Sequence, residues 1–107
     1  MNTSFDKRED GFEAKFAQDE KLKFKATVRR NKKIGLWAAE LMGLSGDAAE
    51  EYAKDVVKED FIEPGDEDVF RKLRRDLDAA GVEQSDHQIR RTFDEMMALA
   101  IEEIESE

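Results

Sequence analysis

The sequence contains no cysteine, one proline and one histidine among its 107 residues. Without cysteine, disulfides and thiolate chemistry are excluded, and without a second histidine a structural zinc site is excluded in practice. No apolar run approaches the roughly 20 residues that a membrane-spanning helix needs. The first ten residues, MNTSFDKRED, lack the basic start and apolar stretch of a secretory signal. We therefore expect a soluble, cytoplasmic chain with no direct membrane insertion.

The motifs of common enzymes are missing as well. The lone His87 falls in the first turn of the last predicted helix, where it has no visible partner, and we interpret it as exposed and structurally neutral. The acidic stretch DEDVFRKLRRDL lacks the sixth-position glycine and the closing glutamate of a calcium loop. No loop of the form GxxxxGK[ST] is present to bind phosphates. We predict no catalytic residue, no metal site and no required cofactor, so the chain is not expected to be an enzyme.

Charge is abundant but unevenly distributed. Charged residues make up 42% of the chain, where about 25% is usual. Residues 1–33 contain ten Lys and Arg against six Asp and Glu, whereas residues 34–107 contain eight against twenty-one. The net charge of −9 argues against nucleic acid as a partner. A basic arm before an acidic body is typical of an interaction segment.

The apolar spacing predicts an all-α chain, an antiparallel bundle of about four core helices joined by short connections. In the second of these helices, Ser45 is a plausible N-cap, and apolar residues recur at steps of three and four. They are Ala49, Tyr52, Ala53, Val56, Val57 and Phe61. Pro64 and Gly65 then end the helix, and Asp66 is expected to cap the next one.

The later helices have clear ends. The helix that begins near Asp66 should end at Gly81, with Val82 touching Leu77 as in a Schellman motif. Ser85 and Gln88 fit a capping box that opens the last helix. The apolar stripe of that last helix consists of Ile89, Phe93, Met96, Met97, Ala100, Ile101 and Ile104.

Residues 1–18 are predicted to be separate from the bundle of residues 19–107. Phe5, Phe12 and Phe16 share one helical face, but the next steps of three and four reach Asp19 and Glu20. Burial of each ring contributes roughly 1.5–3 kcal/mol, which cannot offset an ordering cost of about 1–2 kcal/mol per residue. We expect a mobile, helix-prone segment that folds when a partner's groove accepts the aromatic face. The alternative is that the rings dock on the bundle.

Beyond the segment, the first bundle helix should bury one stripe. Ile34, Trp37, Ala38 and Leu41 share this face, which Phe24 and Val28 could lengthen backward. Packing in the core is the simpler interpretation of Trp37, and the alternative is that its ring forms a flat surface against which a ligand binds.

Between Lys21 and Ala39 there are seven basic residues and no acidic one. They are Lys21, Lys23, Lys25, Arg29, Arg30, Lys32 and Lys33. Two interpretations stay open: a solvated face paired with the acidic body, or an anion site in which Arg and Lys bind phosphate oxygens.

At this point the sequence resembles a known family, the zeta subunit that inhibits the ATPase of alpha-proteobacterial F-type ATP synthases. The resemblance lies in FDKREDGFEAKFAQDEKLKFKA, RRNKKIGLWAAELMG, AAEEYAKDVVKEDF, GDEDVFRKLRRDL and the acidic C-terminal helix. It spans nearly the full chain. It implies a four-helix bundle with an inhibitory N-terminal segment that enters a catalytic interface between alpha and beta subunits and reaches the central rotor. Rotation would be blocked in the direction of ATP hydrolysis while synthesis is permitted.

The resemblance also implies sites. Carried onto this chain, the contacts with the ATP synthase would come from Phe5, Arg8, Phe12, Lys15 and Phe16. The protein would lie in the cytoplasm, peripheral to the inner membrane through the ATP synthase. Some members bind adenine nucleotide, and the corresponding candidates are Lys25, Arg29, Arg30 and Trp37. A small nucleotide-binding sensor is therefore the alternative function, with ATP or ADP as a regulatory ligand.

Overall fold

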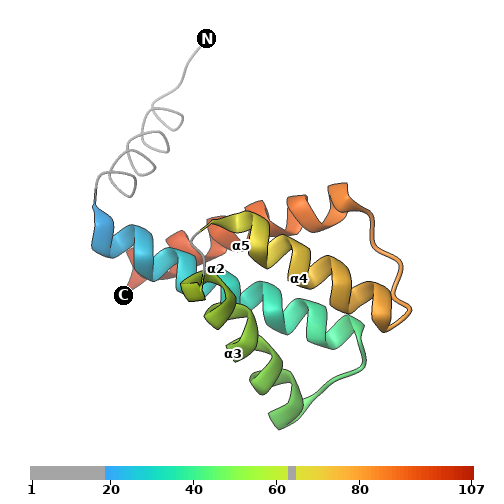
Figure 1. The fold of residues 1–107 in the computed structure, drawn as a ribbon. Helices are drawn as coiled ribbons and strands as arrows, with labels where there is room; N and C mark the ends of the chain where they lie inside the picture. Colours follow the sequence, from blue (N-terminus) through green and yellow to red (C-terminus); the bar gives the residue numbers. More distant parts are fainter. Residues whose placement is uncertain (1–18, 63–64) are drawn as a thin grey trace.

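The computed structural model describes residues 19–62 and 65–107, which form a bundle of four helices (Figure 1). The helices are α2 (Glu20–Leu41), α3 (Gly46–Ile62), α4 (Asp66–Ala79) and α5 (Asp86–Ser106). Successive helices run in roughly opposite directions, and α2 lies next to each of the other three. The prediction of an all-α antiparallel bundle is confirmed. Within the described ranges no helix is long and apolar enough to cross a membrane.

Two helices end as their glycines predict. Gly81 has a φ of 74°, and the N–H of Val82 donates to the carbonyl of Leu77 at 2.9 Å. This is the Schellman arrangement, in which a left-handed glycine returns the chain to satisfy the last carbonyls. Gly43, with a φ of 81°, ends α2 in the same way. Local sequence alone therefore sets both ends.

The helix starts are a mixed result. The capping box of α5 is confirmed: the Gln88 N–H donates to Ser85 Oγ at 3.0 Å, and the Ser85 N–H donates to Gln88 Oε1 at 2.8 Å. The predicted cap of α4 is wrong. Gly65 occupies the N-cap position without a side-chain bond, and Asp66 is the first helical residue. Its carboxylate is bound instead by Arg30 of α2.

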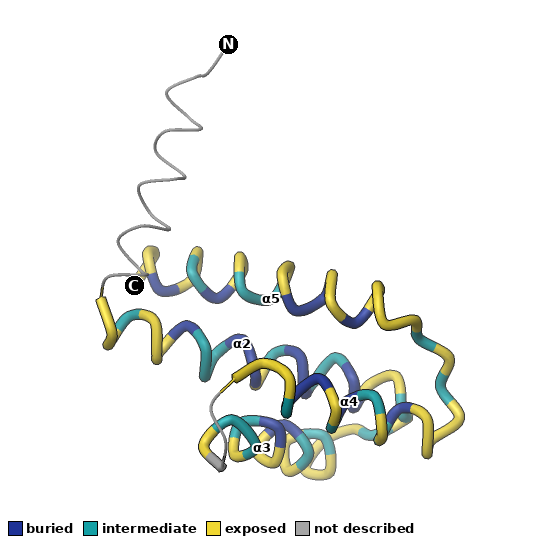
Figure 2. Tube along the Cα trace, turned by 45° about the horizontal axis from the view of Figure 1, so that its top comes forward, coloured by how far each residue is buried: buried dark blue, intermediate teal, exposed yellow. Residues whose placement is uncertain are grey.

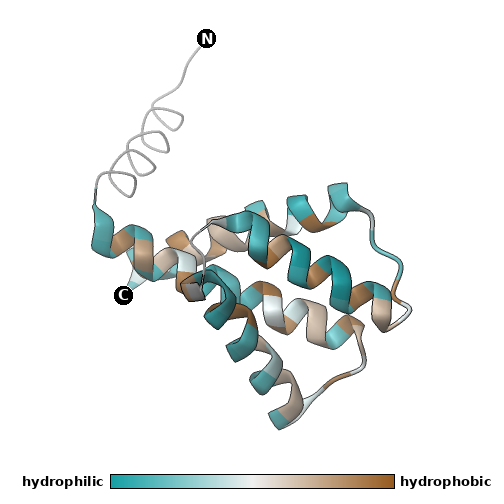
Figure 3. Cartoon of the chain, viewed as in Figure 1, coloured by the Kyte–Doolittle hydropathy of each residue, from teal (hydrophilic) through white to brown (hydrophobic). Residues whose placement is uncertain are grey.

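The main core lies where α2 faces the other three helices, and the buried residues follow the inner side of each helix (Figure 2). It consists of Ile34, Ala38, Val56, Val69, Phe70, Leu73, Leu77, Ile89 and Phe93. Trp37 is partly buried and packs against this cluster, as the core interpretation predicts. A smaller cluster joins Ala26 near the start of α2 to Ile104 near the end of α5. Most of α4 is coloured as hydrophilic in Figure 3, with its few hydrophobic residues spaced along the helix.

The buried face of α2 differs from the predicted stripe. Ile34 and Ala38 are buried as expected, but Phe24 and Leu41 are exposed by 57% and 37%. The helix turns its small residues inward because α3 approaches at Gly35. A Cβ built on Gly35 would lie 2.9 Å from the Ala53 Cα. The prediction that Phe24 extends the core is therefore wrong.

This close approach gives a testable prediction. Gly35→Ala should lower the free energy of unfolding by about 1–3 kcal/mol, since α3 must move to admit the methyl group. Intrinsic helix propensity alone would predict a gain of about 1 kcal/mol. Glu40→Ala, at an exposed position of the same helix, is the control and should change stability only slightly. Urea unfolding measures both, and a stabilised Gly35→Ala protein would contradict the packing.

Candidate functional site

The residues predicted to contact the ATP synthase, Phe5, Arg8, Phe12, Lys15 and Phe16, lie outside the described residues. The structure does show where the segment joins the bundle. Asp19 is the N-cap of α2, and its Oδ1 accepts the backbone N–H groups of Lys21 at 3.0 Å and Leu22 at 3.2 Å. The helix therefore has its own start directly after residue 18, at an exposed end of the bundle. The domain boundary itself stays a prediction.

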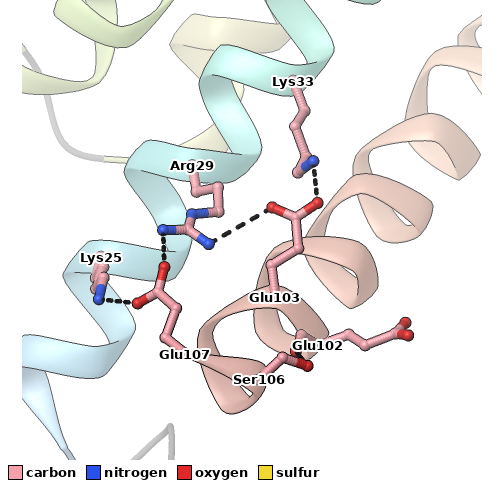
Figure 4. A network of polar contacts seen from close by, with 7 residues as sticks. All are labelled: Lys25, Arg29, Lys33, Glu102, Glu103, Ser106 and Glu107. Carbon is pink, nitrogen blue, oxygen red and sulfur yellow. Dashed lines mark hydrogen bonds and ion pairs between the residues drawn. The ribbon is translucent and has the colours of Figure 1, made fainter.

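The basic residues along one side of α2 are paired with acidic residues of α5 (Figure 4). Lys25 Nζ and Arg29 Nη2 both lie 2.5 Å from carboxylate oxygens of Glu107. Arg29 Nη1 lies 3.5 Å from Glu103 Oε1, and Lys33 Nζ lies 2.5 Å from Glu103 Oε2. Three cations thus share two carboxylates, which is the arrangement expected of a basic face paired with the acidic body.

The pairing changes the acidity of the groups involved. The hydrogen bond from Lys25, followed by that from Arg29, lowers the pKa of the Glu107 carboxyl below its ordinary value. The hydrogen bond to Glu107 in turn raises the pKa of the Arg29 guanidinium. Both side chains remain accessible to water, so dissolved salt weakens these pairs.

Arg30 points into the bundle and serves a different purpose. Only 4% of this residue is exposed. Its two terminal nitrogens donate to the carboxylate oxygens of Asp66 at 3.1 and 2.7 Å, and Nη2 also donates to Asn31 Oδ1 at 2.8 Å. The guanidinium carbon lies 5.0 Å from the ring centroid of Phe93. Arg30 therefore ties α2 to both α4 and α5.

Sequence reasoning missed this structural role, although a signal was present. Ala26, Arg30, Ile34 and Ala38 are four residues apart, and all four are buried. A basic residue inside such a row is expected to be buried with its row. The neighbouring Asn31 is also buried, and its Nδ2 has no partner among the described residues.

The four candidate nucleotide residues are not brought together. Lys25 and Arg29 meet at Glu107, whereas Arg30 is committed to Asp66. Trp37 lies eight residues beyond Arg29, about 12 Å along the helix axis. Any anion site on α2 would therefore use Lys25 and Arg29 without Arg30 or Trp37.

A second surface feature was missed by the sequence. Phe61 was assigned to the buried face of its helix, but it is 58% exposed and packs against Phe24 with ring centroids 5.7 Å apart. Beside this pair is a cavity of about 360 Å³ between α2 and α3, which we call the α2–α3 groove. It is lined by Phe24, Lys25, Val28, Arg29, Lys32 and Val57.

Among the residues that the structure describes, no three His, Asp or Glu side chains gather to hold a metal ion. His87 is exposed in the first turn of α5, as predicted.

The described residues define a class: a small four-helix bundle in which basic residues of α2 pair with the acidic end of α5. The family described as ATPase inhibitor subunit zeta matches residues 1–103, and the chain belongs to this family. A protein with a solution NMR structure is 45% identical, with a TM-score of 0.70 over 79% of this chain and 96% of that one. No curated protein matches the chain.

Family membership establishes the general function. The chain is an ATPase inhibitor that interacts with the F-type ATP synthase, and it is a regulatory protein rather than an enzyme. The resemblance identified from the sequence is thereby confirmed.

The paired charges give a prediction on pH. Because the pKa of Glu107 is lowered in the fold, its ion pairs are complete above the ordinary value of 4.5 and are lost as pH falls through the lowered pKa. A carboxyl ¹³C titration should show Glu107 protonating below pH 4.5. Lys25→Gln should move this transition upward, whereas Lys54→Gln on α3 should leave it unchanged. An identical Glu107 titration in Lys25→Gln would contradict the assigned pairing.

Proposed function

We propose that residues 1–18 are the inhibitory element of this chain. They would enter a catalytic interface between alpha and beta subunits, reach the central rotor and block rotation in the hydrolysis direction. The observation that carries the proposal is the family match, which begins at residue 1 and therefore includes the whole segment. In the sequence, Phe5, Phe12 and Phe16 have the spacing of one helical face, with charged residues between them.

The structure of the bundle supports separate roles for residues 1–18 and for the helices that follow. Its main core is assembled from residues of α2, α3, α4 and α5. The start of α2 is capped by Asp19, so the helix needs no preceding turn to satisfy its first N–H groups. The cap at the start of α2 thus comes from Asp19, which supports a separate role for residues 1–18.

A rotary ATPase can be inhibited by preferential binding to one of its states. A ligand with equal affinity for every rotor position would shift none of them. An aromatic-faced segment that fits one catalytic interface better than the others satisfies this condition. The protein would then lie at the cytoplasmic side of the inner membrane, held there through the ATP synthase.

The aromatic face provides the test. Loss of each ring removes roughly 1.5–3 kcal/mol of burial. Replacing Phe5, Phe12 and Phe16 together by Ala should therefore raise the concentration for half-inhibition of ATP hydrolysis at least about a hundredfold. Leu99→Ala, which removes a 44% exposed side chain from α5, is the control and should inhibit as the native chain does. Undiminished inhibition by the triple variant would contradict the assignment of residues 1–18.

A second candidate is binding of adenine nucleotide at Lys25 and Arg29. The observation in its favour is that these cations already gather the oxygens of Glu107 and Glu103, as they would gather phosphate oxygens. The same observation sets a condition, because a nucleotide must displace both carboxylates. Binding at this site would loosen the contact between the start of α2 and the end of α5.

This condition makes the nucleotide site testable. Added ATP at moderate salt should shift the amide resonances of residues 21–33, and Arg29→Ala should weaken the binding. Glu107→Gln should strengthen it several-fold, because one competing charge is removed. Glu95→Gln is the control, because this exposed carboxylate pairs with Arg91 of its own helix. Absence of shifts in both the native and the Glu107→Gln chains would exclude the site.

A further inference from the structure

The α2–α3 groove exposes aromatic surface that the fold does not use. Phe24 and Phe61 are exposed by 57% and 58%, although each is large enough to anchor a core. Their ring planes are inclined at 48°, and Phe24 also lines the groove together with Val28 and Val57. A joined apolar surface that stays open in a small domain is typical of a docking site.

The charged residues that line the groove, Lys25, Arg29 and Lys32, are all basic, on a chain whose net charge is −9. Lys25 and Arg29 are already paired with acidic residues of α5, which leaves Lys32 as the cation best placed to meet a partner. Lys32 is only loosely held, since its Nζ lies 3.9 Å from Glu50 and its side chain is 58% exposed. An occupant should therefore present apolar side chains flanked by Asp or Glu.

The position of the groove points to the same partner as the segment. Phe24 comes four residues after Glu20, the first residue of α2, which corresponds to about 6 Å along the helix. If residues 1–18 enter a catalytic interface, the groove must lie near the mouth of that interface. A contact there would be almost intramolecular once the segment is inserted.

We propose that the α2–α3 groove is a second docking site for the ATPase head. It receives an apolar side chain from an acidic helix or loop beside the interface that holds residues 1–18. This inference rests on the proposed function and deepens it, because the bundle then contributes affinity and does not merely carry the segment. A second copy of this chain fits less well, since a symmetric contact would bring Lys32 of one copy close to Lys32 of the other.

The direct test replaces both rings in the full-length chain. Phe24→Ala with Phe61→Ala should raise the dissociation constant for the isolated ATPase about tenfold or more. Inhibition at saturating concentration should remain complete, because residues 1–18 are intact. Leu99→Ala, also an exposed apolar residue, should bind as the native chain does. An unchanged dissociation constant in the double variant would overturn the proposal.

The salt dependence of binding tests the role of Lys32 in the groove independently. Lys32→Gln should reduce the salt dependence of binding, whereas Lys54→Gln, a lysine of α3 with 66% of its side chain exposed, should not. Equal salt dependence in the two variants would count against an acidic partner surface.

The outcomes separate this inference from the proposed function. A native chain that binds without inhibiting, and loses binding in the double variant, would retain the groove and refute the rotation block. A native chain that inhibits, with a double variant that binds equally well, would refute the groove alone. Self-association of the native chain in sedimentation, abolished by the double variant, would reassign the groove to a second copy. No binding by the native chain would refute both.

Discussion

The bundle depends on the enclosure of α2 by the other three helices. Gly35 allows α3 to approach to van der Waals distance, and Arg30 links α2 to Asp66 of α4 and Phe93 of α5. Near its start, Ala26 packs with Ile104 of α5. Because these contacts fix the rotation of α2 about its axis, they also decide which of its basic residues face α5, the interior or solvent.

The orientation of α2 about its own axis connects the fold to the proposed function. The start of α2 is the junction with residues 1–18, and the same turns form one wall of the α2–α3 groove. Lys25 and Arg29, which line this groove, are neutralised by Glu107 of α5. In this account the bundle is a firm base from which the inhibitory segment reaches the ATPase, with the groove as a second point of contact.

Much of the fold could be predicted because the helix ends depend on residues that are close in the sequence. The Schellman end at Gly81 and the capping box of Ser85 and Gln88 depend on residues a few positions apart. The buried face of α2 could not be predicted, because two adjacent stripes of residues are compatible with helical spacing. Only contacts with helices distant in the sequence determine which stripe is buried. Phe24 was therefore assigned to the core and Arg30 to the surface, and the spacing along α3 misplaced Phe61 for the same reason.

The candidate site, like the fold, could be predicted only where its signals are local in the sequence. Ion pairs that join residues 70 to 82 positions apart leave no local signal. The inhibitory role of residues 1–18 came from resemblance, and the family match supports it without describing its geometry.

Hydrogen exchange of the full-length chain, free and bound to the ATPase, tests most directly the claim that residues 1–18 are the inhibitory element. The account predicts new protection in residues 1–18 on binding, with the amides of α4 unchanged. Protection confined to α4 and α5, with residues 1–18 exchanging as in the free chain, would contradict it.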